Sequence, residues 1–340
     1  MTPVLEVRDL GVTIGTDEGP VLAVDGLSFD MAAGEVVALV GESGCGKSMT
    51  ALAIMGLLPP AAARRGSVRL AGRELTALDS RAMRDVRGRE IAMVFQEPMT
   101  SLNPAFTVGY QIAEVLRRHQ GLSRRAATAR AVELLDRVRI PAPAARIGEY
   151  PHQMSGGMRQ RVMIAMAVAC NPKVLIADEP TTALDVTIQA QVLDIMRELR
   201  ADLGTAILLI THDLGVVADI ADRVEIMYAG THAESAPAGE LFAAPGHPYT
   251  TGLLGAVPRP GLPAGDDRKR LQEIPGMVPT VRERAAACVF APRCGRADAG
   301  CRAARPVLRE IAPGHFAACF HPVNQAGALA QPETGGQEAR

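Results

Sequence analysis

The fold follows from the stretch Gly41-Glu42-Ser43-Gly44-Cys45-Gly46-Lys47-Ser48. It fits the pattern GxxxxGK[ST] at every fixed position, between the apolar run Val36–Val40 and a helical pattern over residues 49–58. A strand, a glycine-rich turn and a helix in this order form a phosphate-binding loop, in which main-chain N–H groups converge on phosphate oxygens. The sequence therefore predicts an α/β fold with a nucleoside triphosphate site.

Individual roles follow from this pattern. We expect Lys47 to neutralise the β- and γ-phosphates and Ser48 to offer its hydroxyl to Mg²⁺. The remaining positions predicted to bind the nucleotide are Gly41, Glu42, Ser43, Gly44, Cys45, Gly46 and Met49. The alternative, a glycine-rich turn with a chance lysine, is disfavoured by the strand before it and the helix after it.

Two further stretches carry chemistry. A predicted strand over 174–177 runs into Asp178 and Glu179. We expect Asp178 to hold Mg²⁺ through water and Glu179 to polarise the water that attacks the terminal phosphate. The stretch Ser155-Gly156-Gly157-Met158 opens a helical pattern over 159–170 and suits an anion, although alone it is more often a helix N-cap.

Composition excludes several classes of protein. The 340 residues allow one large domain or two to three smaller ones, and 48% apolar residues suffice for a sizeable core. With 36 basic against 37 acidic residues, the charge balance gives no global attraction to nucleic acid. No apolar run approaches the length of a membrane helix, and the N-terminal residues carry acids and no signal-peptide core. We therefore expect a soluble cytoplasmic protein that reaches a membrane only through partners.

The alternation of short apolar runs with longer helical patterns predicts a mainly parallel sheet covered by helices. Besides Val36–Val40, the strands are predicted at 4–8, 174–177, 207–210 and 224–229. Helical periodicity over 108–118 and 124–138 predicts a helical insertion at about 97–155. After about residue 240 proline and glycine are frequent, so little regular structure is expected, and the polar tail 324–340 is expected to be mobile.

The order of the motifs indicates a family. In chain order they are the phosphate loop, Phe95-Gln96-Glu97-Pro98, Ser155-Gly156-Gly157-Met158-Arg159-Gln160, Asp178-Glu179, Ala183-Leu184-Asp185 and Thr211-His212-Asp213. Together they resemble the ATP-binding cassette of ABC transporters over about residues 1–240. This resemblance implies ATP hydrolysis, and it argues against a nucleotide kinase or a small GTPase, which lack the Ser155 motif.

The resemblance also implies roles. Gln96 would sense Mg²⁺ and the γ-phosphate, His212 would reach the γ-phosphate, and Asp185 would lie in a loop that contacts a second cassette. The signature loop from Ser155 to Met158 would meet the nucleotide bound to that second cassette. The family usually stacks adenine on an aromatic residue, but residues 12–15 contain none, so Ile14 is the candidate for contact with the base.

Longer motifs narrow the resemblance. They are Gln96-Glu-Pro-Met-Thr-Ser-Leu-Asn-Pro104, Tyr150-Pro-His-Gln-Met-Ser-Gly-Gly157, Ala177-Asp-Glu-Pro-Thr-Thr-Ala-Leu-Asp-Val-Thr-Ile-Gln189 and His247-Pro-Tyr-Thr250. These are similar to the ATPase subunits of dipeptide/oligopeptide importers, a pattern that nickel importers share. The resemblance implies a chain on the cytoplasmic face of the membrane, paired with a paralogous ATPase subunit. It also implies two integral-membrane permeases, an extracytoplasmic solute-binding protein that acts through them, and no nucleic acid. A non-transport protein with this cassette is the remaining alternative.

The segment 241–323, expected to be a small separate domain, holds Cys288, Cys294, Cys301 and Cys319. A disulfide is disfavoured in a cytoplasmic protein, and structural zinc sites usually use cysteine pairs only two to four residues apart. The wider spacing here favours a [4Fe–4S] cluster, and the C-terminal extension of the peptide-importer ATPases resembles this pattern. We therefore expect such a cluster, with Zn²⁺ or four free thiols as the alternatives.

Overall fold

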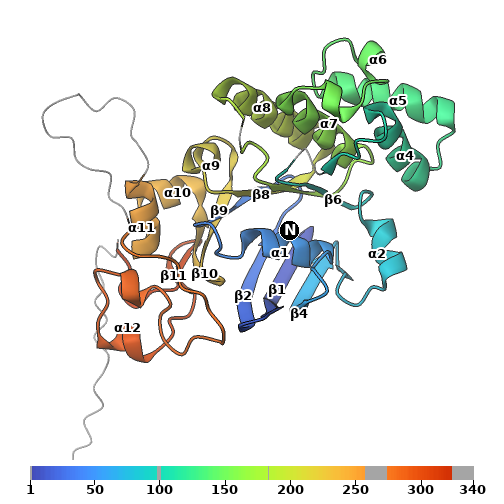
Figure 1. Cartoon of the computed structure of the whole chain (residues 1–340). Helices are drawn as coiled ribbons and strands as arrows, with labels where there is room; N and C mark the ends of the chain where they lie inside the picture. The colour runs from blue at the N-terminus through green and yellow to red at the C-terminus, as the bar shows by residue number, and fades with distance from the viewer. Residues whose placement is uncertain (1, 98–100, 183, 257–273, 324–340) are drawn as a thin grey trace, which may run out of the picture.

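The chain is represented by a computed structural model, shown in Figure 1, that describes residues 2–97, 101–182, 184–256 and 274–323. The tail 324–340, expected to be mobile, lies outside the described residues. So do Pro98, which ends the Gln96 motif, and Ala183, which begins the Asp185 motif.

The larger sheet carries the phosphate loop at its centre. Its strand order is β11-β12-β10-β9-β3-β8-β7-β6. The strands are β3 Val36–Val40, β6 Ile91–Val94, β7 Val174–Asp178, β8 Ala206–Thr211, β9 Arg223–Tyr228, β10 Thr231–Pro237, β11 Arg309–Ala312 and β12 His315–Ala317. The strands from β9 to β6 are parallel, while β10, β12 and β11 are added antiparallel. All five residues of β3 are buried between β8 and β9, as its unbroken apolar sequence predicts.

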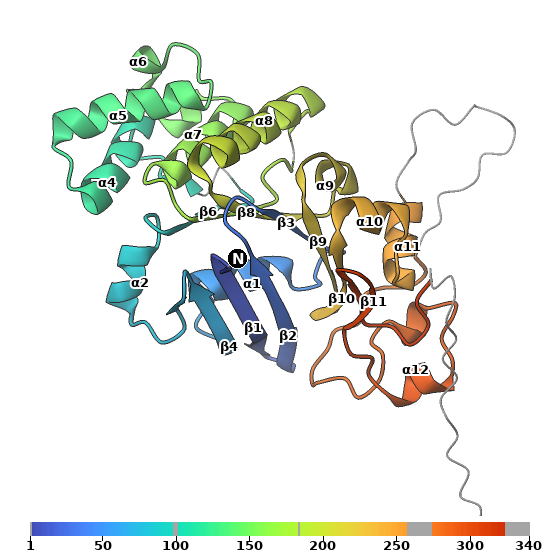
Figure 2. The same cartoon turned by 180° about the vertical axis from the view of Figure 1, so that it is seen from behind.

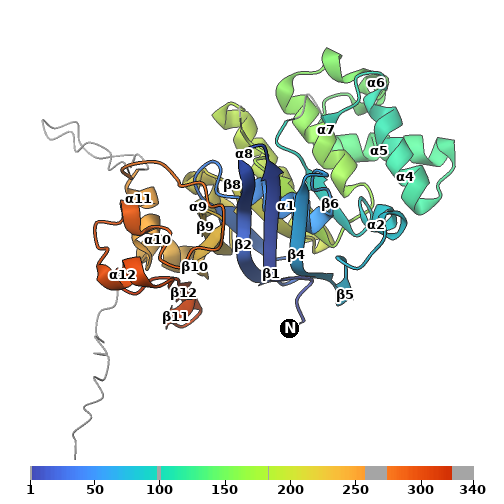
Figure 3. The same cartoon turned by 60° about the horizontal axis from the view of Figure 1, so that its bottom comes forward.

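A smaller antiparallel sheet lies on one side of this core. Its order is β2-β1-β4-β5, formed by β1 Leu5–Thr16, β2 Gly19–Met31, β4 Ala62–Leu70 and β5 Arg73–Glu74. Helix α1 (Lys47–Met55) lies between the two sheets (Figures 1 and 2), and its buried residues join one apolar core with strands of both. Figure 3 shows the strands of the small sheet side by side. The helix that follows the phosphate loop is therefore fixed from two sides.

Helices cover the other face of the larger sheet and extend beyond one end (Figure 2). They are α4 Val108–Gln120, α5 Arg124–Arg137, α6 Pro143–Arg146, α7 Gly156–Val168, α8 Val186–Leu203 and α9 Leu214–Ile220, while α2 Ser80–Val86 lies at the side of the small sheet. The helices predicted at 108–118 and 124–138 are confirmed. They begin where the Thr107 and Ser123 hydroxyls accept main-chain N–H groups. Between them and α7 lies the short helix η1 (Pro151–Gln153). Among the described helices, none is both long enough and apolar enough to cross a bilayer.

The C-terminal region is more regular than its sequence indicates. It contains α10 Ala238–Ala243, α11 Pro248–Gly255, η2 Ala291–Arg293 and α12 Ala299–Ala303 as well as β11 and β12. The expectation of little regular structure after residue 240 is wrong at α11 and at the β11–β12 pair, whereas the described residues 274–308 contain only the short helices η2 and α12. Helix α11 begins where the His247 imidazole accepts the N–H of Tyr249 and where Pro248 can occupy the first turn without losing a hydrogen bond. Strand β12 pairs with β10, so this region extends the larger sheet.

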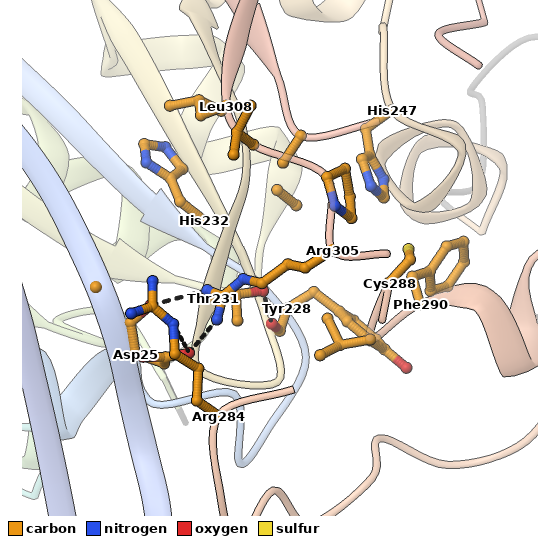
Figure 4. Close-up of a pocket in the computed structure, with 16 residues that line it drawn as sticks. Asp25, Tyr228, Thr231, His232, His247, Arg284, Cys288, Phe290, Arg305 and Leu308 are labelled. Atoms are coloured by element: carbon orange, nitrogen blue, oxygen red, sulfur yellow. Dashed lines mark hydrogen bonds and ion pairs between the residues drawn. The ribbon is translucent and has the colours of Figure 1, made fainter. Parts of the chain in front are cut away.

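A buried carboxylate joins the C-terminal region to the small sheet. Asp25 on β2 is 2% exposed, and its Oδ1 lies 2.6 Å from the guanidinium of Arg65 on β4. From the C-terminal region, Arg305 donates to Asp25 Oδ2 and Arg284 lies 3.8 Å from it. Figure 4 shows Asp25 with Arg284 and Arg305 at one side of a pocket of about 200 Å³, with Cys288 and Phe290 at the other side. Asp25 therefore offsets part of the positive charge that these arginines bring to the pocket.

This arrangement predicts that Asp25 stabilises the fold. Asp25→Asn keeps the shape but removes the charge that the arginines share, and should lower the free energy of unfolding by about 3 kcal/mol. The matched control is Asp9→Asn, since the exposed Asp9 also pairs with Arg65, and its loss should cost under about 1 kcal/mol. Urea denaturation of both variants measures the difference. Equal effects of the two substitutions would contradict the role of Asp25.

Candidate functional site

A pocket of about 420 Å³ opens where the phosphate loop leads from β3 into α1. Of the residues predicted to bind nucleotide, the phosphate loop and the start of α1 contribute Ser43, Gly44, Gly46, Lys47, Ser48 and Met49 to its wall. Gln96 and Glu179 complete this side of the pocket. The size suits a small organic ligand.

The shape of the phosphate loop depends on glycine and on its lysine. Gly46 has a φ of +102°, and a Cβ there would lie 2.2 Å from the carbonyl oxygen of Ala23, so no other residue fits. Lys47 Nζ donates to the carbonyl oxygens of Gly41 at 2.8 Å and Glu42 at 3.0 Å. The ammonium group therefore closes the loop and lies at its centre, where it can meet an anion.

Oxygen donors for a divalent cation lie beside this lysine. Ser48 Oγ donates to Asp178 Oδ1 at 3.1 Å, which brings together a hydroxyl and a carboxylate from α1 and β7. Burial raises the pKa of Asp178, and the hydrogen bond from Ser48 partly offsets this effect. Hydroxyl and carboxylate oxygens are ligands that Mg²⁺ prefers, so this pair fits that ion.

The main chain of Glu179 has an unusual conformation. Its φ of +47° is unusual for a residue with a side chain, and its main-chain N–H is fixed by the Ile210 carbonyl oxygen at 2.8 Å. Its carboxylate accepts a hydrogen bond from Gln96 Nε2 at 2.9 Å, and its Oε1 lies 3.1 Å from His212 Nδ1. The structure thus brings together three of the predicted residues, Glu179, Gln96 and His212.

These contacts keep Glu179 ionised. Burial alone would raise the pKa of its carboxyl group, but hydrogen bonds from His212 and from the Thr182 hydroxyl, 2.9 Å away, outweigh burial and lower it. Near neutral pH the group is therefore a carboxylate that accepts protons, which is the form required of a base.

Among the predicted residues in and around the phosphate loop, Gly41, Glu42, Cys45, Asp178 and His212 are not part of this wall as the structure describes it. The Glu42 carboxylate binds the Arg293 guanidinium through two hydrogen bonds of 2.8 and 3.0 Å, and its N–H donates to the Tyr249 hydroxyl at 2.9 Å. Cys45 is fully buried. Glu42 and Cys45 therefore support the loop from behind.

Sequence reasoning missed both partners of Glu42. Arg293 and Tyr249 lie more than 200 positions away in the chain from this residue. The only signal was the motif that contains Tyr249, to which no chemical role could be assigned.

The Ser155 motif lies on a different surface. Ser155 is exposed and begins α7, where its Oγ accepts the N–H of Met158 at 3.3 Å. Gly157 allows close packing, because a Cβ there would lie 2.6 Å from Ile188 on α8. Asp185 is likewise exposed and caps α8 by accepting the Ile188 N–H at 2.9 Å. In the described structure, Ser155, Gly156, Gly157 and Met158 are absent from the wall of the nucleotide pocket.

The late cysteines converge. Cys288, Cys294, Cys301 and Cys319 line one small pocket, together with the aromatic rings of Phe290 and Phe320. The sulfur of Cys301 also forms a group with Asp298 and His321, whose ligand atoms all lie within 4.8 Å of one another. Burial raises the pKa of Cys319 to about 11. The four cysteines therefore share one pocket, and the group of close ligand atoms found in the described part of the chain is Asp298, Cys301 and His321.

Comparisons with known proteins agree with this geometry. The family model described as ABC transporter matches residues 24–182, and the model described as oligopeptide/dipeptide transporter, C-terminal region, matches residues 233–301. A probable peptide ABC transporter ATP-binding protein of Sinorhizobium fredii is 53% identical over 320 residues, which cover 93% of this chain and 94% of that protein. A putative peptide import ATP-binding protein of Brucella melitensis is 52% identical over 331 residues, covering 94% and 97% of the two chains.

Solved structures give the same result for the fold. A dimeric ATP-binding cassette in a post-hydrolysis state with ADP and Pi matches with a TM-score of 0.62 and 27% identity, over 69% of this chain and 98% of its own. CbiO1 of Clostridium perfringens, part of the ABC transporter complex CbiONQ, matches with a TM-score of 0.60 and 26% identity, over 72% of this chain and 92% of its own. The predicted cassette fold is therefore confirmed.

The contact between Arg293 and Glu42 predicts that the C-terminal region supports the phosphate loop. Arg293→Ala should weaken Mg-ATP binding roughly ten-fold, since hydrogen bonds to charged groups contribute about 1.5–3 kcal/mol. Arg293→Lys should recover only part of the affinity, because lysine lacks the two-pronged geometry of arginine. Arg302→Ala, an exposed arginine on α12, is the matched control. Titration calorimetry checks the prediction, and wild-type affinity in Arg293→Ala would contradict it.

Proposed function

Because the chain belongs to the family of ATP-binding subunits of peptide ABC transporters, we propose that it powers the import of dipeptides or oligopeptides by hydrolysing Mg-ATP. The observation that carries the chemistry is the ionised Glu179 carboxylate, held beside the phosphate loop by Gln96 and His212. A carboxylate fixed in this way can orient and polarise a water molecule for in-line attack on a phosphoryl group.

Each residue of the site has a task in this reaction. Lys47 binds the β- and γ-phosphates, and the main-chain N–H groups of the loop add further donors. Ser48 and Asp178 hold Mg²⁺, which neutralises charge on the phosphates when bound. Glu179 accepts the hydrogen bond of the attacking water, while Gln96 and His212 keep its carboxylate in place. In this scheme the charged side chains that act on the phosphates and the water are already in position before the reaction begins.

The Ser155 motif supports a composite site. Because Ser155 and Gly156 are exposed at the start of α7, they are free to meet a nucleotide bound by another subunit. ATP then lies between two cassettes and holds them together until hydrolysis. Within the proposal the second cassette is a paralogous chain, so the working ATPase is a heterodimer.

A hollow in the helical region supports a permease contact. A pocket of about 430 Å³ lies between α4 and α5 and includes Tyr110 and Arg117. Tyr110 is 45% exposed and stacks on the exposed Phe106, with ring centroids 4.8 Å apart. Exposed aromatic side chains are common anchors in protein interfaces. We assign this surface to contact with the cytoplasmic part of the permeases. The two integral-membrane permeases would hold the chain at the cytoplasmic face of the membrane. They would receive peptide from an extracytoplasmic solute-binding protein.

The four late cysteines are proposed to hold a [4Fe–4S] cluster. Support comes from their convergence on one pocket with an aromatic lining, and from a region whose small core a ligated centre would stabilise. Asp298, Cys301 and His321 form an overlapping set that suits Zn²⁺. In either case the centre stabilises the C-terminal region and takes no part in hydrolysis.

The test of the hydrolytic role uses the assembled transporter. The chain alone should hydrolyse ATP slowly, and addition of the second cassette and the permeases should raise the rate, because only then is each site complete. Glu179→Gln should bind Mg-ATP as the wild type does but lose most turnover, while Lys47→Ala should weaken binding itself. ATPase assays and nucleotide titrations separate these effects. Turnover near wild type in Glu179→Gln would remove the proposed role.

The nature of the metal centre is tested by anaerobic purification, with analysis of iron, sulfide and zinc and a visible spectrum. A cluster predicts about four irons and an absorption band near roughly 400 nm, lost in Cys301→Ser. Asp298→Ala should leave the iron in place, since aspartate is not needed for a four-cysteine cluster. Stoichiometric zinc that both substitutions remove would favour the overlapping set instead.

A further inference from the structure

The nucleotide pocket has a wall that comes from the C-terminal region. Residues 278–281 line the pocket together with Ile14 and Val21 of the small sheet. Val278 and Val281 are half-buried and pack against the apolar core around β9 and β10, while Ile14 packs against the core of the small sheet. Beyond the phosphate loop, the pocket is therefore lined by aliphatic side chains from two parts of the fold.

This wall is fixed in place at both ends. Shortly before the segment, Arg293 donates to the carbonyl oxygens of Ile274 at 3.1 Å and Pro275 at 2.8 Å. At its end, the Leu22 N–H donates to the Val281 carbonyl oxygen at 2.8 Å. Since Leu22 lies on β2, the segment is attached to the same sheet that carries Ile14.

An ion pair strengthens this attachment. Arg282 follows the segment directly, and its Nη2 lies 2.8 Å from Oε2 of Glu18, in the turn that joins β1 to β2. The wall is therefore part of the folded pocket before a ligand arrives.

We propose that residues 278–281 hold the base of the bound nucleotide against Ile14 and Val21, and so help to set nucleotide affinity and base selectivity. The proposal rests on the assignment of the phosphate loop around Lys47. When the loop takes the triphosphate, the ligand that remains is a sugar and a flat base with apolar faces and a polar edge. The valines offer aliphatic contact to the faces.

The pocket wall also offers hydrogen-bonding groups to the polar edge of the base. Thr280 is exposed at the pocket wall, and within the described part of the chain its main chain has no hydrogen-bond partner. Its N–H and carbonyl groups are therefore available to the edge of a base. Selectivity at this site would come from such main-chain contacts, since no aromatic ring belongs to the described pocket wall.

The first test separates the base from the phosphates. Affinities of the full-length chain for Mg-AMP-PNP and for magnesium tripolyphosphate are measured by displacement of a fluorescent ATP analogue. The double variant Val278→Ala/Val281→Ala should bind AMP-PNP roughly ten-fold more weakly, because it removes apolar contact with the base. Its affinity for tripolyphosphate should be unchanged. Val307→Ala, an exposed valine elsewhere in the C-terminal region, should alter neither.

The outcomes are distinct. Unchanged affinity for AMP-PNP, or an equal loss for both ligands, would overturn the proposal, since the segment would then be irrelevant or merely structural. Failure of the unaltered chain to bind tripolyphosphate or AMP-PNP would instead overturn the assignment of the phosphate loop.

Reversing the charges of the Arg282–Glu18 ion pair tests the same wall without changing its apolar side chains. Arg282→Glu and Glu18→Arg should each weaken AMP-PNP binding about two- to five-fold, as expected for loss of one exposed ion pair. The combined variant should restore the affinity, which a folding defect would not do. If the single variants bind AMP-PNP as the wild type does, the wall does not depend on this attachment and the proposal fails.

Discussion

The ammonium group of Lys47 organises the phosphate loop, because it binds two carbonyl oxygens of the loop that also surrounds it. The backbone can follow this path only because Gly46 leaves room for the Ala23 carbonyl. Everything near the site is arranged around this turn. β3 fixes its start, α1 fixes its end between two sheets, and Glu42 ties its outer side to Arg293 and Tyr249.

Local sequence predicted the centre of the fold well. Val36–Val40 is a strand at the predicted residues, and β7, β8 and β9 begin and end within a residue of expectation. For β3, β7 and β8 the signal is a short continuous apolar run, which is typical of a buried strand. The small sheet was largely missed. β2 and β4 mix buried and exposed residues irregularly, and several breaks in register interrupt the pairing of β1 with β2, so no clean alternation marks them.

The residues of the candidate site also fall into two groups, those predicted from the sequence and those found only in the structure. Residues that bind phosphate and Mg²⁺ belong to short motifs whose geometry is local, so Lys47, Ser48 and Glu179 could be named from the sequence. The residues that support the loop and line the rest of the pocket come from the distant C-terminal region. Val281 and Arg293 look like ordinary residues of a proline-rich segment, and only the folded chain places them against β2 and Glu42. Tertiary contacts between segments far apart carry no signal in a single sequence.

The pairing of β12 with β10 has a consequence for the protection of the sheet. Without β12, the edge of β10 would present unpaired main-chain groups, to which a strand from another molecule could add. This edge is synthesised long before its partner, so a nascent or truncated chain exposes it. In the complete structure the outermost strand is the short β11, which ends the sheet with the charged side chains of Arg309 and Glu310. Strands β12 and β11, which are made after β10, therefore also protect this edge of the sheet against aggregation.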